Sequence, residues 1–245
     1  MGIFAKSVAR AETEAFYAAL RAELKKGRTK DQCKAIDFLY TLDTPAAKGC
    51  GGKKKKGLLG TGWDMDDYIA YVEKHVNDLN LKQRAIEKIG LDESQISEIP
   101  PVVLAAFKLN GEGVETKSEE TNIKNQWRYV SNKYWVTWIF FSSTQIYTHT
   151  YVFDTTTDVT FEMTRDFFYK DITCIRTEHE TTEKRMSRKK GCFFWKKQYF
   201  YQVKEWDTMS ITVPGDNYSF CCQTNETIEQ SIQAAKAMIR EKKNG

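Results

Sequence analysis

Residues 133–153 read KYWVTWIFFSSTQIYTHTYVF, and this stretch decides the fold class. Two runs rich in β-branched and aromatic residues, 133–141 and 145–153, flank a short polar segment of Ser and Thr. β-branched and aromatic side chains favour strands, whereas Ser and Thr between two such runs favour a turn. The stretch therefore predicts a β-hairpin.

Strand-like sequence surrounds this hairpin. Between Trp127 and Phe220 the pattern predicts about seven short antiparallel strands. Residues 154–158 (DTTTD) and 214–217 (PGDN) predict turns, and the polar residues 181–191 predict another. The remaining expected strands are 159–169, 171–180, 192–206, 209–213 and 218–222.

Residues 224–243 predict an amphipathic helix after the last strand. Ile228, Ile232, Ala235 and Ile239 recur at spacings of three and four, so they share one helix face. A helix with one apolar face needs a sheet to cover. We therefore expect this helix to close the β-rich part of the chain.

The order of these elements resembles the pleckstrin-homology-like (PH-like) superfold, including its GRAM-type and bacterial members. The resemblance covers residues 127–243 and rests on YKDIT at 169–173 and MSITVPGDNYSF at 209–220, followed by the helix. It implies an α+β protein with an antiparallel seven-stranded barrel capped by a C-terminal helix. Lipid-binding members carry a Lys/Arg pattern on the first hairpin, whereas residues 141–145 here are uncharged. The resemblance therefore implies an interaction module without a phosphoinositide site.

The N-terminal part predicts helices over residues 8–26, 30–42, 64–79 and 80–90. Asp64 is the expected N-cap of the third helix, and Gly90 is the expected terminator of the fourth. We expect three regions: a mostly helical region at 1–109 with a flexible Gly/Lys loop at 46–62, a linker at 110–126, and the PH-like part at 127–243.

Two basic runs are candidate binding sites. The first lies in the Gly/Lys loop and comprises Lys53, Lys54, Lys55 and Lys56. It is either a solvated loop or a contact for phosphate groups, and it does not match a phosphate-binding P-loop. The second flanks the aromatic residues 193–201, and a basic turn beside Glu residues is either solvated or an anion-binding surface. It comprises Lys184, Arg185, Arg188, Lys189, Lys190, Lys196 and Lys197.

Composition excludes several functional classes. The chain has 37 basic and 33 acidic residues, a net charge of +4 that is too small to indicate nucleic-acid binding by itself. We expect no transmembrane segment and no secretory signal, and hence a cytoplasmic protein with reduced cysteines. The pattern at 64–67 (DMDD) suits helix capping and does not match a calcium loop, so no metal site or cofactor is predicted.

No catalytic motif stands out, because His75, His149 and His179 are the only histidines and none has a recognisable partner motif. The leading hypothesis is a non-enzymatic interaction module that binds a protein partner. One alternative is an anionic-surface binder, for membrane phosphates or nucleic acid, that uses the two basic runs. The other is an enzyme with an unrecognised site.

Overall fold

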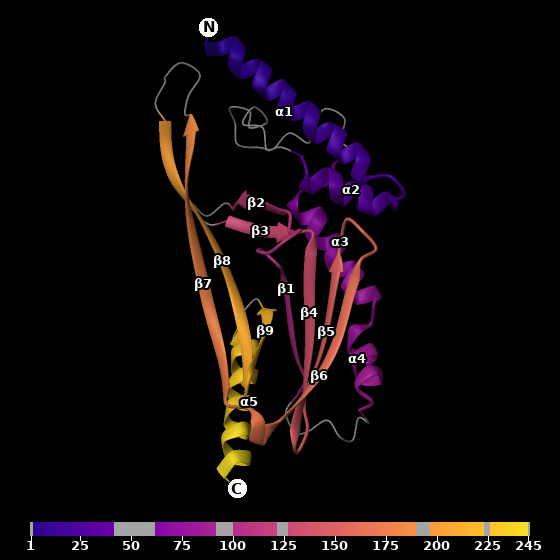
Figure 1. The fold of residues 1–245 in the computed structure, drawn as a ribbon, viewed down its shortest axis with the longest axis vertical. Coiled ribbons are helices and arrows are strands. Elements are labelled where there is room, and N and C mark those ends of the chain that lie inside the picture. Colours follow the sequence, from indigo (N-terminus) through magenta and orange to yellow (C-terminus); the bar gives the residue numbers. More distant parts are fainter. Residues whose placement is uncertain are drawn as a thin grey trace. The chain divides into compact units, whose positions relative to one another are not determined.

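The computed structural model describes residues 2–41, 62–91, 100–121, 127–189, 197–222 and 226–244. Helices and antiparallel strands both occur, so the predicted α+β class is confirmed (Figure 1). The helical elements are α1 (Gly2–Leu24), α2 (Lys30–Leu39), α3 (Met65–Asp78), α4 (Leu81–Ile89), the 3-10 turn η3 (Tyr169–Asp171) and α5 (Glu226–Asn244). The strands are β1 (Val102–Phe107), β2 (Thr116–Glu120), β3 (Trp127–Ser131), β4 (Lys133–Phe141), β5 (Gln145–Asp154), β6 (Thr160–Phe168), β7 (Cys174–Lys189), β8 (Lys197–Val213) and β9 (Asp216–Cys222).

The chain divides into two compact units. Unit 1 comprises Met1–His75 and Asp154–Val159, and unit 2 comprises Val76–Phe153 and Thr160–Gly245. The predicted boundary at residues 110–126 stays a prediction. Within that range the structure places β2, which pairs with β3.

Unit 1 contains α1, α2, most of α3 and the loop that joins β5 to β6. Asp64 caps α3, because the Asp67 amide donates to Asp64 Oδ1 at 2.9 Å and the Asp64 amide donates to Asp67 Oδ2 at 3.1 Å. This confirms the predicted N-cap. The rings of Phe38 and Tyr68 stack with centroids 4.8 Å apart. The Tyr68 hydroxyl lies 2.7 Å from Thr155 Oγ1, so the β5–β6 loop is part of this core.

Unit 2 contains three antiparallel sheets among the described residues. The four-stranded sheet has the order β1-β4-β5-β6, and the three-stranded sheet has the order β7-β8-β9. The predicted hairpin is confirmed, because β4 and β5 coincide with it almost residue for residue. β1 and β9 are edge strands that lie side by side without a hydrogen-bonded ladder between them. The closed seven-stranded barrel is therefore not confirmed.

One apolar cluster fills the space between the two larger sheets and α5. Ile139 and Phe141 of β4, Met209 of β8 and Phe220 of β9 are almost fully buried in it. α5 contributes Ile232, Ala235 and Ile239, the stripe read from the sequence. Burying one such side chain stabilises a fold by about 1.5–3 kcal/mol. The predicted closing helix is confirmed, although residues 224 and 225 at its expected start lie outside the described residues.

Two predictions about the long hairpin are wrong. Residues 181–189 continue β7, where a turn was expected, and Lys197–Val213 form one strand, where two were expected. β7 pairs with β8 along the whole range from Cys174↔Thr212 to Lys189↔Lys197. Backbone pairing can hold a polar strand in this register, and β7 contains neither Gly nor Pro to interrupt it.

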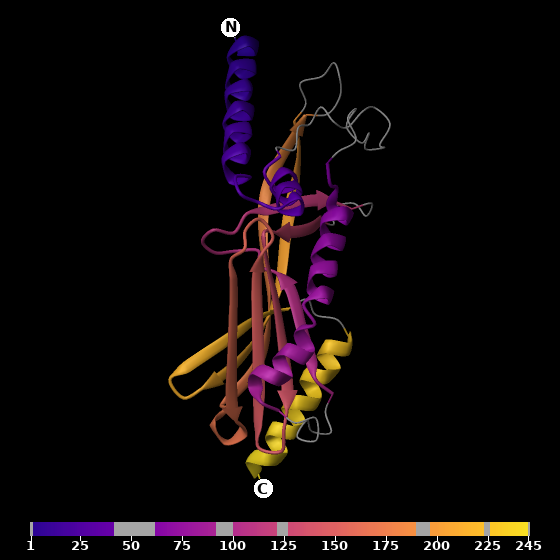
Figure 2. The ribbon, with the colours of Figure 1, turned by 90° about the vertical axis from the view of Figure 1, so that its right-hand side faces the viewer.

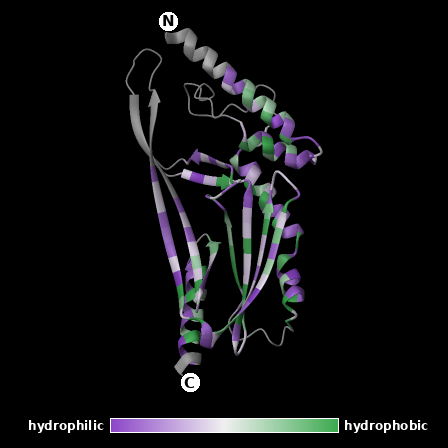
Figure 3. Cartoon of the chain, in the orientation of Figure 1, coloured by the Kyte–Doolittle hydropathy of each residue, from purple (hydrophilic) through white to green (hydrophobic). Residues whose placement is uncertain are grey.

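The hairpin of β7 and β8 continues past the end of β9 (Figures 1 and 2). β9 pairs with β8 only from Asp207↔Cys222 to Val213↔Asp216. Between Lys197 and Trp206, β8 therefore pairs with β7 alone among the described strands. Both β1 and β7 are edge strands, but β7 is mostly hydrophilic, whereas β1, which lies beside β9, is mostly hydrophobic (Figure 3).

Candidate functional site

Several of the predicted basic residues lie outside the described residues. These are Lys53, Lys54, Lys55, Lys56, Lys190 and Lys196. The expected flexible loop at 46–62 also lies outside the described residues, except for Gly62. The proposal that they bind anionic groups stays a prediction.

The other predicted basic residues lie on the two-stranded part of the hairpin, where the backbone alone is described. Lys184, Arg185, Arg188 and Lys189 belong to β7, and Lys197 belongs to β8. The four residues of β7 were expected in a turn, and this expectation is corrected to a strand, whereas Lys197 was expected in a strand. The register sets Lys189 opposite Lys197 and Arg185 opposite Tyr201. The structure thus brings basic and aromatic positions together across the ladder.

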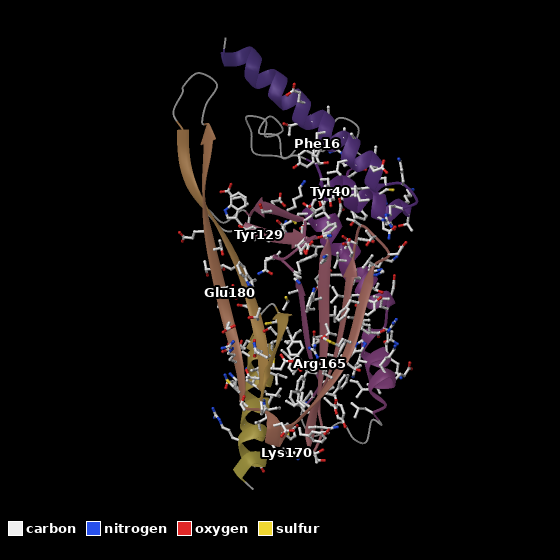
Figure 4. The ribbon with its side chains drawn as sticks, viewed as in Figure 1. Phe16, Tyr40, Tyr129, Arg165, Lys170 and Glu180 are labelled. Carbon is white, nitrogen blue, oxygen red and sulfur yellow. The ribbon has the colours of Figure 1, made fainter. Side chains whose placement is uncertain are left out.

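A pocket of about 180 Å³ lies in unit 2, at the ends of β1 and β9 and beside β7 and β8. Phe107 and Trp206 supply aromatic surface, while Glu178 and Glu180 supply carboxylates and Asp207 is a further lining residue. Glu180 lies on β7 (Figure 4). The rest of the lining consists of Ala106, Leu109, Asn110, Thr208, Ser219, Cys221 and Cys222.

The strand register explains why these side chains meet. Glu178 pairs with Thr208, and Thr208 pairs with Cys221, which gives one row across the three strands. Glu180 pairs with Trp206 two positions further along β7. Because alternate residues of a strand share a face, both rows lie on the same face of this sheet.

The pocket is acidic. Its described lining contains no Lys, Arg or His. Arg176 Nε lies 3.3 Å from Glu178 Oε1, and His179 Nδ1 lies 2.7 Å from Asp207 Oδ1. The hydrogen bond to Asp207 raises the pKa of His179. Glu178 therefore has a cationic neighbour on the protein itself, whereas the Asp207–His179 pair belongs to the opposite face of this sheet.

The two thiols in the lining are poor nucleophiles. Burial, followed by the nearby Asp207 and Cys221, raises the pKa of Cys222 to about 12. Burial also raises the pKa of Cys221, against the opposing charge of Lys108. A thiol with a raised pKa stays protonated near neutral pH and behaves as a small apolar group. Cys221, which shares a face with Thr208, therefore adds apolar surface to the pocket, whereas the thiol of Cys222 belongs to the buried core of unit 2.

Two kinds of feature are absent from the described part of the chain. No group of three or more His, Cys, Asp or Glu side chains there is arranged to hold a metal ion. No described helix combines the length and the apolar character that a membrane crossing requires.

Sequence reasoning missed this pocket. It considered the Glu residues of this region only as neighbours of a basic turn. Their spacing by two along a strand already placed Glu178 and Glu180 on one face. The partner on β8 could not be found, because the strand boundaries there were misplaced.

Comparisons with known protein families, with curated proteins and with solved structures found no match.

Proposed function

We propose that this chain is a non-enzymatic interaction module that binds a protein partner at the pocket of unit 2. The observation that carries the proposal is the size and lining of that pocket. Its volume of about 180 Å³ is below the ~300–1,000 Å³ typical of pockets that enclose a small ligand. A pocket of this size suits one inserted side chain of a partner, which is how interface anchors bind.

The composition of the pocket supports the same proposal. Interface hot spots combine aromatic surface with a few polar groups at the edge. Phe107 and Trp206 provide aromatic surface, and Glu178 and Glu180 provide polar groups. The protonated thiol of Cys221 fits a binding surface better than a nucleophile.

We also propose that the β-rich part is related to the PH-like superfold. Seven strands, β3 to β9, follow one another from Trp127 and precede α5. α5 packs on the cluster shared by the two larger sheets, as a capping helix should. A reducing compartment such as the cytoplasm is part of the proposal. It is supported by the four described cysteines, Cys33, Cys174, Cys221 and Cys222, which are free.

The test is affinity capture from native lysate with the wild type and two variants. Thr208→Trp fills the pocket, whereas Thr164→Trp makes the same change on an exposed residue of β6. Circular dichroism and urea unfolding verify that both variants fold. A protein captured by the wild type and by Thr164→Trp, but lost from Thr208→Trp, supports the proposal. Equal capture by all three proteins, or no capture by the wild type, contradicts it.

A second candidate function is binding to an anionic surface through the β7–β8 hairpin. The observation in its favour is the register that sets Lys189 opposite Lys197 and Arg185 opposite Tyr201. Binding to phosphates strengthens as salt falls, because counterions are released. Titration of anionic liposomes and single-stranded oligonucleotides across a salt series tests it, and absence of binding at low salt contradicts it.

A further inference from the structure

We propose that β7 pairs with β7 of a second copy of this chain, in antiparallel orientation, so that the two hairpins form one continuous sheet. This pairing uses the outer edge of β7 and does not depend on the proposed function. When one edge strand is added to another, backbone hydrogen bonds supply the affinity and side chains supply the choice of partner.

The edge of β7 that faces away from β8 has no partner among the described strands. β7 is the terminal strand in the order β7-β8-β9, and no described strand lies on its other side (Figure 1). From Glu180 to Lys189 its ladder contains β8 alone, because β9 ends at Cys222, opposite Asp207. A two-stranded ribbon is only marginally stable in water, and a third strand stabilises it. A strand added at the edge of β7 therefore supplies what this part of the hairpin lacks.

The charges of β7 favour a second copy as the added strand. Residues 174–183 contain three carboxylates and one arginine, whereas residues 184–189 contain four basic residues and no acidic one. Charged residues on an edge strand usually keep other strands away. Antiparallel pairing of two copies removes that obstacle, because the acidic half of each strand then lies opposite the basic half of the other. Parallel pairing would set like halves together.

One antiparallel register matches these charges best. It sets Thr181 of one copy opposite Thr181 of the other. Glu178 then lies opposite Lys184 of the second copy, and His179 lies opposite Glu183. Each pair occurs twice, because a dimer of this kind has two-fold symmetry. Opposite charges directly across a ladder stabilise it, and like charges destabilise it.

Neighbouring registers bring like charges together. With Glu180 or Glu183 at the centre, a carboxylate lies opposite its own copy. With Thr182 at the centre, Arg176 lies opposite Arg188 of the second copy. The register centred on Thr181 avoids all of these pairs.

The described side chains that take part are accessible to a second copy. The Glu178 side chain is 42% exposed and the His179 side chain is 58% exposed. Glu178 has Arg176 of its own strand as a neighbour at 3.3 Å, but an ion pair between exposed side chains contributes little and can exchange partners. The hydrogen bond to Asp207 raises the pKa of His179, so its imidazole holds a positive charge more readily and suits the Glu183 carboxylate opposite it.

Sedimentation velocity of the full chain over a concentration series tests the dimer. Glu178→Lys and Lys184→Glu should each raise its dissociation constant at least about fourfold, because each substitution places two like-charge pairs in the ladder. Glu112→Lys makes the same reversal at an exposed residue outside β7 and should leave the dissociation constant unchanged. Circular dichroism and urea unfolding verify that the variants fold.

An equimolar mixture of Glu178→Lys and Lys184→Glu separates this register from a general effect of charge. In the mixed dimer every reversed charge lies opposite a charge of the other sign, so the mixture should dimerise about as well as the wild type. Within one chain the two positions are six residues apart, roughly 20 Å along an extended strand. Recovery in the mixture therefore requires contact between two chains.

A crosslink tests the centre of the register without changing any charge. Residues directly opposite each other in an antiparallel ladder have Cα atoms about 4.5–5.5 Å apart, which suits a disulfide. Thr181→Cys should therefore form an oxidised dimer readily, beyond any that the natural cysteines give in the wild type. Thr177→Cys is the matched control, because it is exposed on the same strand but lies opposite position 185 in this register.

Several results would overturn the proposal. A wild type that stays monomeric would leave the edge of β7 to a strand of another protein. Unchanged dimers from both reversal variants would place the contact on another surface. A mixture that fails to recover, or equal crosslinking of Thr177→Cys and Thr181→Cys, would contradict the register.

Discussion

Glu162 on β6 accepts two hydrogen bonds from the Arg84 guanidinium on α4, each 2.7 Å long. The buried His149 on β5 has its Nε2 atom 2.8 Å from Glu162 Oε1. An ionised carboxylate only accepts hydrogen bonds, so Nε2 of His149 carries the proton. Lys88 lies 3.4 Å from the other carboxylate oxygen. One side chain thus joins α4 to two neighbouring strands of unit 2.

Replacing this carboxylate should destabilise unit 2. Glu162→Gln keeps the shape of the side chain but removes the charge that Arg84 and His149 bind. Hydrogen bonds to charged groups contribute about 1.5–3 kcal/mol, so the free energy of unfolding should fall by about that amount. Urea unfolding measures it. Glu112→Gln, at an exposed turn, should stay within about 0.5 kcal/mol of the wild type. Equal effects of the two substitutions would contradict the role of Glu162.

The Glu162 carboxylate should also make the free energy of unfolding depend on pH in the acidic range. The hydrogen bond from Arg84, followed by that from His149, lowers the pKa of Glu162 from 4.5 to about 2. Since the pKa is lower in the folded protein, the stabilisation is complete above pH 4.5 and is lost as the pH falls towards 2. The difference in unfolding free energy between the wild type and Glu162→Gln should shrink across this range. A difference that stays constant would show that the carboxylate is not the titrating group.

Local sequence signals sufficed for some elements. The hairpin of β4 and β5 was predictable because two apolar runs of the right length flank a short polar turn. The cap at Asp64 was predictable because a helix start needs an acceptor for its free amides. Gly90 has a φ of 73°, a conformation that glycine adopts without strain, and it ends α4 as expected.

Contacts that depend on pairing between segments far apart in the chain could not be predicted from the sequence. The polar residues of β7 resemble a turn until Lys197–Val213 is set beside them. The pocket depends on that register, because Trp206 meets Glu180 only through it. Arg84 and Glu162 are also far apart in sequence, and their pairing requires α4 to lie against the sheet. Local periodicity carries no information about such contacts.

We expect the protein to lose stability in alkali because the buried hydroxyl of Tyr169 deprotonates there. Its hydroxyl donates to the Ser142 carbonyl at 2.9 Å, and burial raises the pKa of Tyr169 from 10.0 to about 12. Because the folded state binds this proton more tightly, the stabilisation is complete below pH 10.0 and is lost as the pH rises through about 12.

Tyr169→Phe tests both parts of this prediction. Near neutral pH the variant should lose about 0.5–1.5 kcal/mol, the usual contribution of one hydrogen bond. As the pH rises above 10.0 the wild type should lose its advantage over the variant, because only the wild type has the buried hydroxyl to deprotonate. Urea unfolding in a series of alkaline buffers measures both. If the difference in unfolding free energy between the wild type and Tyr169→Phe stayed unchanged in alkali, the assignment to Tyr169 would be contradicted.

Thr137 and Thr150 form a buried pair on neighbouring strands whose coupling can be measured. Their Oγ1 atoms lie 3.0 Å apart, and each residue is 1% exposed. Thr137→Val keeps the shape of the side chain but leaves the Thr150 hydroxyl without this partner, which should cost about 1–3 kcal/mol. Thr150→Val should cost a similar amount for the reciprocal reason. The double variant removes both hydroxyls together, so its cost should be clearly smaller than the sum of the two single costs. Urea unfolding of the four proteins completes the cycle, and additive costs would show that the two hydroxyls do not depend on each other.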